Sequence, residues 1–502
     1  MNAGKTASLH SRYNPQREAD RYIESLSIDE NKRFFILIEP GMGYIVCALK
    51  KIVPRAKIIS LHIEKPSGFL PSELNSLQWF PEKGLPLDAF LETEIGDSLS
   101  SAIQIVEWRP ALSVYGKAYL ALLEETIDFI KRSDANTRTT KAFGLRWLKN
   151  FFNNLEFLNK AILIAPPDGR AGQKAIPCSL PLLVTGSGPA LEEAIPLISN
   201  KSSNKKNFFI MAVSSSFAAL KARNIIPDLV LSTDGSQWAK YHLFGIFREK
   251  TEFFLASSLT AALPSQCEKI PVLVLCDGSL WQTLILNELK IPFIMLPQRG
   301  TVTASALDLG FFINTHVPNQ NRGNGIYIAG MDLENRDISS HARPYAFDSL
   351  LEEKAGRMNP VYSQEFKRSS LLKAGGSFRI YSSWFKKQLP LYPGAVHPLG
   401  SNNPVFGPSE NTIPNRDEKW ARVSFKTITL DKNGNESPSK RALSALKAAL
   451  KNEAYADALK QELTGLLVPD SSDGRCGDLL ESIQKLLKQK SLGTGSGENC
   501  GK

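Results

Sequence analysis

The stretch Leu182-Leu-Val-Thr-Gly-Ser-Gly-Pro-Ala-Leu191 decides how this sequence is interpreted. Its first four residues predict a short buried strand, and Gly186-Ser187-Gly188 follows directly. Pro189 stands where a helix would begin, a position that tolerates proline because the N–H it lacks has no partner there. Strand, glycine turn and helix start predict a βα unit, with the turn at the carboxyl end of a parallel strand.

This turn is a candidate site for an anionic group. Glycine lets a backbone approach a ligand closely. The N–H groups and the partial positive charge at a helix start favour a phosphate. The alternative, which stays open here, is a tight strand-to-helix turn without a ligand.

Short apolar runs alternate with helix-like segments throughout residues 176–345. Runs that lack strict period-two alternation are typical of a parallel sheet covered on both faces. We therefore predict an α/β fold whose central, doubly wound Rossmann-like domain spans these residues. The predicted strands are Leu182–Thr185, Phe208–Val213, Asp228–Thr233, Phe253–Ser257, Val272–Cys276, Phe293–Leu296 and Ile326–Ala329.

Residues 1–175 are predicted to form a smaller N-terminal α/β domain. An apolar run at Arg33–Glu39, a glycine turn at Pro40–Tyr44 and a second apolar run at Ala56–Ile63 have the order of a βαβ unit.

The region after the central domain is predicted to be mainly helical over residues 346–490. Its helix-like stretches are Ser439–Leu450, Ala454–Leu466 and Asp478–Lys488. Residues 491–502 are rich in Gly and Ser and are predicted to be a disordered tail.

Composition excludes several classes of protein. The 502 residues are 42% hydrophobic and 22% charged, as in soluble globular proteins. Sixty Lys and Arg against fifty Asp and Glu give a net charge of +10, which is too diffuse to predict nucleic-acid binding. No run is long enough for a membrane span and no secretory signal is evident, so a cytoplasmic location is expected. The six cysteines are scattered, which predicts neither a disulfide framework nor a metal site.

Polar residues follow other predicted strands. Ser214 and Ser215 come after one strand, and Asp234-Gly235 ends the next. These groups could bind sugar hydroxyls or phosphate. Alternatively, the serines cap the following helix and Asp234 makes a turn.

A third polar group lies further along the chain. Gly300-Thr301 precedes a helix-like segment, and Gly330-Met-Asp332 follows the last predicted strand. His341 and Tyr345 come shortly after it. A histidine suits general-base catalysis because its pKa lies near neutrality. The plain alternative is a surface-loop histidine.

These segments resemble the motility-associated factors, bacterial flagellin glycosyltransferases that share a domain with archaeal 6-hydroxymethylpterin diphosphokinases of the MptE type. Gly186–Leu191 is similar to the family's G-x-G-P-S-L loop, and Ile225–Asp234 to its strand that ends in aspartate. Gly330–Leu333, followed by His341-Ala342, resembles its G-x-D-L…H-A segment. Leu9–Pro15 is similar to the N-terminal part of these factors.

The resemblance implies a nonulosonic-acid donor, such as CMP-pseudaminic or CMP-legionaminic acid, and Ser or Thr acceptors on flagellin. It implies no cofactor beyond the CMP-activated sugar, and a central domain similar to metal-free bacterial sialyltransferases. Two residues depart from these patterns. Ala190 replaces a loop serine, and Glu334 stands where those sialyltransferases carry a tyrosine that assists the leaving phosphate.

We expect His341 to be the general base, with Asp332 as the alternative base or orienting group. Arg299 or Arg343, together with Tyr345, would stabilise the phosphate charge. No metal ligand is predicted. The predicted donor-binding residues are Gly186, Ser187, Gly188, Pro189, Ser214, Ser215, Asp234, Gly235, Gly300, Thr301, Gly330 and Tyr345.

Three other functions stay open. A methyltransferase or dinucleotide enzyme would use the turn Pro40–Tyr44 with Glu64, although Val46 replaces the third glycine of that motif. A pterin diphosphokinase would need ATP and Mg²⁺, with Asp234 and Asp332 as candidate ligands. A non-catalytic flagellin-binding chaperone would carry a degenerate site.

Overall fold

The structure is a computed structural model, and it describes most of the chain in segments. These are residues 8–66, 77–95, 102–165, 174–177, 180–198, 207–246, 254–297, 299–315, 325–333, 341–364, 377–410, 421–430, 436–467 and 483. The chain forms two compact units, Met1–Ala142 and Phe143–Lys502, and the boundary falls within the long helix α5 (Lys117–Phe157).

Unit 1 contains a parallel sheet with the strand order β3-β2-β1-β4. Its strands are β1 (Phe34–Ile38), β2 (Lys57–Leu61), β3 (Gln78–Trp79) and β4 (Ile103–Glu107). Its helices besides α5 are α1 (Pro15–Glu24), α2 (Tyr44–Ile52), η2 (Pro81–Lys83), α3 (Leu87–Ile95) and α4 (Arg109–Tyr115). The predicted N-terminal α/β fold is confirmed.

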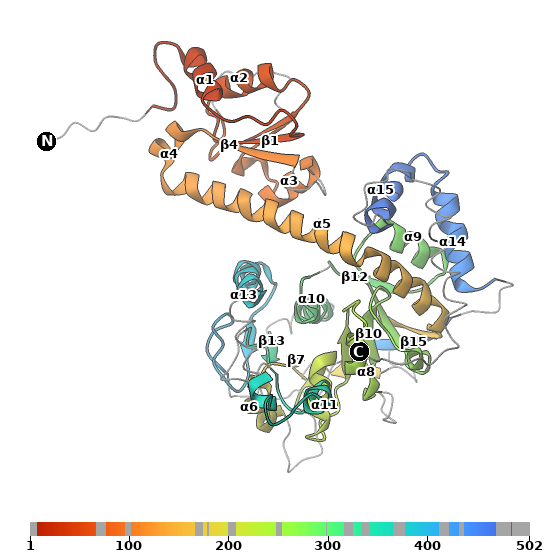
Figure 1. Ribbon diagram of the computed structural model, residues 1–502. Helices are drawn as coiled ribbons and strands as arrows, with labels where there is room; N and C mark the ends of the chain where they lie inside the picture. The colour runs from red at the N-terminus through yellow and green to blue at the C-terminus, as the bar shows by residue number, and fades with distance from the viewer. Residues whose placement is uncertain are drawn as a thin grey trace. The chain divides into compact units, whose positions relative to one another are not determined.

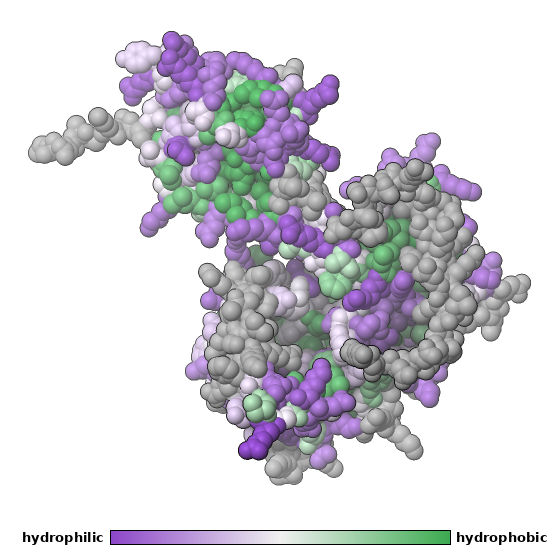
Figure 2. All heavy atoms as spheres, in the orientation of Figure 1, coloured by the Kyte–Doolittle hydropathy of each residue, from purple (hydrophilic) through white to green (hydrophobic). Residues whose placement is uncertain are grey.

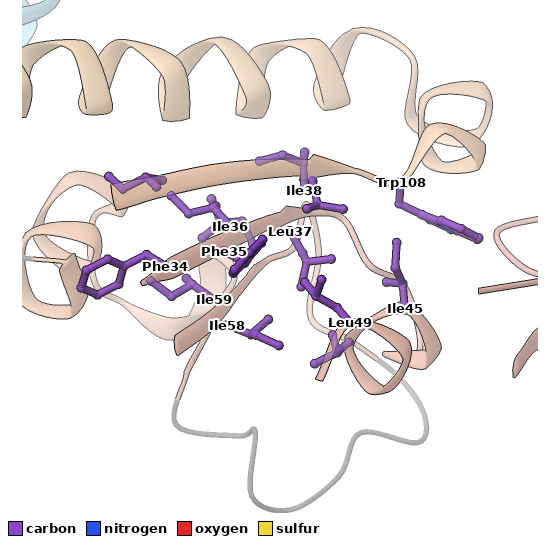
Figure 3. Packing of buried hydrophobic residues seen from close by; sticks show 14 of the residues in the cluster. Phe34, Phe35, Ile36, Leu37, Ile38, Ile45, Leu49, Ile58, Ile59 and Trp108 are labelled. Carbon is purple, nitrogen blue, oxygen red and sulfur yellow. The ribbon is translucent and has the colours of Figure 1, made fainter. Parts of the chain in front are cut away.

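The core of unit 1 forms around β1, in which all five residues are buried. A strand that is apolar along its whole length needs cover on both faces. Figure 3 shows Ile45 and Leu49 of α2 on one side of this strand, and Trp108 just beyond the end of β4. Asn14 begins α1 by accepting a hydrogen bond from the Arg17 N–H at 2.9 Å.

Unit 2 is built on a large mixed sheet with the order β14-β13-β7-β8-β9-β10-β11-β5-β15-β6, and β12 also pairs with β11. The parallel strands are β5 (Lys160–Ala165), β7 (Leu182–Thr185), β8 (Phe209–Val213), β9 (Leu229–Ser232), β10 (Phe254–Ser258), β11 (Val272–Cys276), β12 (Phe293–Met295), β13 (Ile326–Ala329) and β14 (Val396–Pro398). Two further strands, β6 (Lys174–Pro177) and β15 (Ala421–Thr429), complete the sheet, and β15 runs antiparallel to both β5 and β6.

Helices cover both faces of this sheet. Leu182 and Val184 of β7 share a core cluster with α10, whereas Leu183 packs into another cluster with α6. Figure 1 shows β7, β10 and β13 within this sheet and α10 beside it. The helices of unit 2 are α6 (Ala190–Ile198), η4 (Ser214–Ser216), α7 (Phe217–Lys221), α8 (Ala239–Phe244), η6 (Ser265–Lys269), α9 (Leu280–Glu288), α10 (Val302–Thr315), α11 (Asp348–Glu353), α13 (Ser377–Gln388), η8 (Leu389–Leu391), α14 (Pro438–Ala449) and α15 (Ala456–Leu467).

The predicted doubly wound α/β domain is confirmed. All seven predicted central strands are present, and the bounds of β7, β11 and β13 agree with the prediction to the residue.

The division of the chain differs from the expected one at both ends of the central domain. The boundary lies near residue 142 rather than 175, because the end of α5 packs into the core of unit 2 through Phe151 and Phe152. The C-terminal region is not separate, since β15 joins the sheet and α14 and α15 complete the same core. The predicted helix at 478–488, apart from Ile483, and the predicted tail at 491–502 lie outside the described residues.

Polar and apolar side chains are distributed over the described surface as expected for a protein whose apolar residues pack in buried cores. In Figure 2, hydrophilic side chains cover much of the face in view, with smaller hydrophobic patches between them. No helix among the described residues is both long and apolar enough to cross a membrane.

Candidate functional site

The candidate site lies where the strand order of the unit 2 sheet reverses. The chain proceeds from β7 to β8 on one side, and β13 later pairs with the other side of β7. In open α/β sheets, ligands bind outside the carboxyl ends of strands at such a point. Gly186–Pro189 follows β7 here, and Gly330–Leu333 follows β13.

The glycine turn packs against the neighbouring turn. The Gly186 N–H donates to the Ala329 carbonyl and the Gly188 N–H to the Gly330 carbonyl, both at 2.8 Å. A Cβ at Gly186 would lie 2.3 Å from the Gly330 oxygen. Gly330 itself adopts a positive φ of 65°. The glycines therefore allow two backbone turns to meet closely.

The start of α6 is occupied by a carboxylate of the chain itself. Asp332 Oδ2 accepts a hydrogen bond from the Ala190 N–H at 3.1 Å, and the residue is 2% exposed. Negative charge is favoured at a helix N-terminus. The expectation that the amides after Thr185 face a ligand phosphate is therefore wrong for Gly186, Gly188 and Ala190, because these amides bind groups of β13 and of the turn that follows it.

His341 lies over the glycine turn. Its Nδ1 is 3.3 Å from the Ser187 hydroxyl oxygen, and the next residue, Ala342, donates its N–H to the Ser187 carbonyl at 2.8 Å. The imidazole stacks on the ring of Tyr345, with a centroid separation of 4.0 Å and an interplanar angle of 18°. Three predicted residues, Ser187, His341 and Tyr345, are thus brought together.

The two candidate arginines lie in different surroundings. Arg343 is held near the site, since its N–H donates to Glu192 Oε1 and its guanidinium lies 3.1 Å from Asp348 Oδ1. Arg299 pairs with Asp308 at 2.6 Å, and its guanidinium lies 5.1 Å from the centroid of the Trp384 ring. These contacts hold Arg299 between α10 and α13. They do not support the expected contact of Arg299 with a phosphate.

The three serines after β8 divide into two kinds. The Ser216 hydroxyl donates to the Val213 carbonyl at 2.8 Å and lies 2.9 Å from the Thr185 hydroxyl, so it ties β7 to β8. Ser214 is buried and Ser215 is half-buried at the same edge of the sheet. The predicted binding role of Ser214 and Ser215 stays a prediction.

Asp234 is exposed at the end of β9, where its Oδ1 accepts from the Ser236 N–H at 2.7 Å. This is the turn that the plain alternative predicted. Two strands, β7 and β8, separate β9 from β13, so a strand spacing of 4.7–4.9 Å puts their ends roughly 14 Å apart. Asp234 and Asp332 therefore share an edge of the sheet without forming a pair.

Two of the predicted binding glycines lie against helices of the protein itself. A Cβ at Gly235 would lie 2.5 Å from Trp147 of α5, and one at Gly300 would lie 3.1 Å from Tyr381 of α13. Thr301 begins α10, because its hydroxyl accepts from the Ala304 N–H at 3.1 Å. The contacts of these residues are with the protein's own helices.

An aromatic cluster beside the site was not predicted. We name Trp238, Tyr241, Phe244 and Phe347 the aromatic wall. Trp238 and Tyr241 stack with centroids 5.7 Å apart, and Phe347 lies 5.4 Å from Tyr345. The spacing of residues 238, 241 and 244 along one helix was a signal available in the sequence.

In the glycine turn of unit 1, too, a backbone amide binds a side chain of the protein itself. The Met42 N–H donates to His10 Nε2 at 2.9 Å, and burial lowers the pKa of His10, which favours the unprotonated acceptor. Glu64, the candidate ribose-binding acid, accepts from the Tyr115 hydroxyl at 2.7 Å. These contacts do not favour the dinucleotide reading of this turn.

Among the residues that the structure describes, no group of three or more His, Cys, Asp or Glu side chains could hold a metal ion.

Comparison with known proteins finds a family that matches the part of the chain carrying the glycine turn. Residues 148–337 match the family described as 6-hydroxymethylpterin diphosphokinase MptE-like. This part of the chain is similar to the MptE-like family. The match includes β7, β13 and Asp332, and it ends before His341. The recognition of an MptE-like central domain is confirmed.

Two similar proteins extend beyond the MptE-like domain. An uncharacterized protein of Treponema pallidum (strain Nichols) is 30% identical over 304 residues, which are 60% of this chain and 60% of that protein. The chain thus matches less than two thirds of that relative's length. Among solved structures, that of a MAf glycosyltransferase from Magnetospirillum magneticum AMB-1 aligns with 96% of this chain and 78% of its own, at 12% identity and a TM-score of 0.46.

Proposed function

We propose that this protein is a cytoplasmic glycosyltransferase that moves a nonulosonic acid from a CMP-activated donor to Ser or Thr of flagellin, and so serves flagellar assembly and motility. The observation that carries the proposal is the position of His341. It lies over the glycine turn of an MptE-like domain, at the point where the strand order reverses. The resemblance of the surrounding motifs to the motility-associated factors supplies the donor and acceptor classes.

The proposed reaction needs a base and a stabilised leaving group. The acceptor hydroxyl oxygen bonds to the anomeric carbon of the sugar, while the bond from that carbon to the phosphate oxygen breaks. The hydroxyl proton passes to His341, and CMP leaves with the electron pair. The stacked ring of Tyr345 and the contact with Ser187 hold the imidazole in place.

The donor phosphate takes a different position from the one expected of the glycine turn. Because Asp332 already occupies the start of α6, a second anion there would be repelled. The proposal therefore puts the phosphate along the edge that carries Ser214, Ser215 and Arg343. Asp332 then acts by fixing the turn under His341 rather than as a base.

The test is transfer of sugar to flagellin. Purified protein, CMP-pseudaminic or CMP-legionaminic acid and unmodified flagellin are incubated, and the intact mass of flagellin is measured. We expect added sugar masses, and we expect His341→Ala to lower the rate by about 100-fold or more, since loss of a general base typically costs 10²–10⁴. His397→Ala is the matched control and should keep the rate. It removes a histidine of β14 that pairs with Glu410.

A loss of less than about tenfold in His341→Ala would contradict the assignment of the base. No sugar on flagellin with either donor would contradict the proposed transfer, and a non-catalytic flagellin-binding role would then be favoured if flagellin still bound.

A second function is favoured by the description of the matched family, pyrophosphate transfer to 6-hydroxymethylpterin. It requires ATP as the co-substrate and Mg²⁺. Incubation with 6-hydroxymethyl-7,8-dihydropterin, ATP and Mg²⁺ would yield AMP and the pterin diphosphate. Formation of AMP without transfer to flagellin would replace the first proposal by this one.

A further inference from the structure

The aromatic wall is exposed beside the candidate site. Trp238 is 61% exposed, Tyr241 42% and Phe244 41%. Single exposed aromatic residues are common, but several in mutual contact mark a binding surface. Trp238 also contacts Phe347, with the ring centroids 6.2 Å apart. The wall is therefore formed by two chain segments, one after β9 and one after His341.

The wall is continuous with the reactive histidine. Phe347 lies 5.6 Å from Tyr241 and 5.4 Å from Tyr345, which in turn stacks on His341 at 4.0 Å. A ligand that touches Trp238 or Tyr241 would thus extend along connected rings to the base.

The chemistry of the wall favours a neutral planar ring over a phosphate. His242 contacts Phe347 at 4.9 Å, and burial lowers its pKa to about 4, so it carries no charge near neutral pH. Asp234, with an exposed carboxylate, precedes the wall and can accept from ring N–H or sugar hydroxyl groups.

We propose that the aromatic wall stacks on the planar heteroaromatic ring of the substrate. In the proposed function, on which this inference rests, that ring is the cytosine of the CMP-activated donor. In the alternative function it is the pterin. Stacking of a base on an aromatic side chain is worth about 1–3 kcal/mol, so each of the exposed rings should change affinity measurably.

The experiment is calorimetric titration of the full chain with three probes: CMP, cytidine and 6-hydroxymethylpterin. We expect Trp238→Ala and Tyr241→Ala each to weaken binding about 5- to 150-fold, the range that corresponds to that stacking energy. The loss should be the same for CMP and cytidine, because the contact is with the base. Trp238→Phe should retain most of the affinity.

Tyr455→Ala is the matched control, since Tyr455 is 44% exposed and belongs to a different segment, directly before α15. Thermal unfolding of each variant checks that the fold is kept. Equal affinity of wild type, Trp238→Ala and Tyr241→Ala for a probe that binds would overturn the inference, while leaving the transfer assay with flagellin unaffected.

Two further outcomes separate the inference from the proposed function. Binding of the pterin alone, weakened by Trp238→Ala, would support the inference and contradict a CMP donor. Unchanged binding of CMP together with lost binding of flagellin in Trp238→Ala would show a protein-docking surface and overturn the inference.

Discussion

At the scale of single residues, close packing decides what the glycine turn does. The motif itself is typical of phosphate binding, and nothing in its spacing predicts that the Asp332 carboxylate folds back onto the start of α6. That contact depends on the course of the chain after β13, which is a tertiary property. By contrast, the contact of His341 with Ser187 was predictable in outline, because the carboxyl ends of parallel strands meet at one edge.

Gly188→Ala tests this packing. A Cβ at Gly188 would lie 2.0 Å from Asp332 Oδ2, so the carboxylate must move away from α6. We expect the free energy of unfolding to fall by about 1–3 kcal/mol, as is typical of overpacking. Urea unfolding measures it. Gly465→Ala is the control, since a Cβ there meets nothing within 4 Å and alanine favours the helix. Equal stability of both variants would contradict the packing argument.

His242 predicts a dependence of stability on pH. Burial lowers its pKa in the folded protein to about 4, from the ordinary 6.5. Between these pH values the unfolded chain binds the proton more strongly than the folded protein does. The stability that neutral His242 contributes is therefore fully present above about pH 6.5 and is lost as the pH falls towards 4. His242→Leu should therefore show a smaller loss of stability than the wild type over this window.

Urea midpoints of both proteins at several pH values from 7 to 4 provide the measurement. Other groups titrate in the same window, and comparison with the variant removes their contribution. Parallel curves for the two proteins would count against a buried, neutral His242.

At the scale of helices and strands, the sequence predicted what local patterns specify. Buried parallel strands such as β7 and β11 are short apolar runs bounded by turn residues, and both were predicted to the residue. The strand β15 was missed, because Val423, Ser424 and Phe425 are all buried and Lys426 is exposed, so its burial lacks the period-two alternation that marks a strand. Its partner β5 ends more than 250 residues earlier, so no local signal indicates the pairing.

Helix α5 shows how an element is anchored by polar side chains. Asn154 is 5% exposed and donates to the carbonyls of Leu259 and Ala261, both at 2.8 Å. Asn154→Ala would leave these two carbonyls unpaired, and we expect a loss of about 1–3 kcal/mol. Asn159→Ala, at a half-buried asparagine whose side chain makes one long hydrogen bond of 3.3 Å to the Glu268 carbonyl, is the control. Thermal unfolding should give a clearly lower midpoint temperature for Asn154→Ala than for Asn159→Ala.

At the scale of the whole molecule, the C-terminal region is part of the central sheet. A chain that stops before Ala421 lacks β15, α14 and α15, which contribute to the sheet and to the core of unit 2. We expect this truncated chain to lose cooperative unfolding of unit 2 and to aggregate. A chain that ends at residue 490 lacks only the predicted tail and is the control. Cooperative unfolding of the shorter chain, measured by circular dichroism, would contradict an integral role of this region.

The position of β15 also bears on synthesis at the ribosome. Unit 1 consists of residues 1–142, so all its strands have emerged long before translation ends. Strand β5, by contrast, lacks its partner on one side until β15 has been translated, more than 250 residues later. We therefore expect unit 1 to fold during translation, as N-terminal domains generally do, while the nascent unit 2 exposes an unpaired edge that chaperones would have to shield.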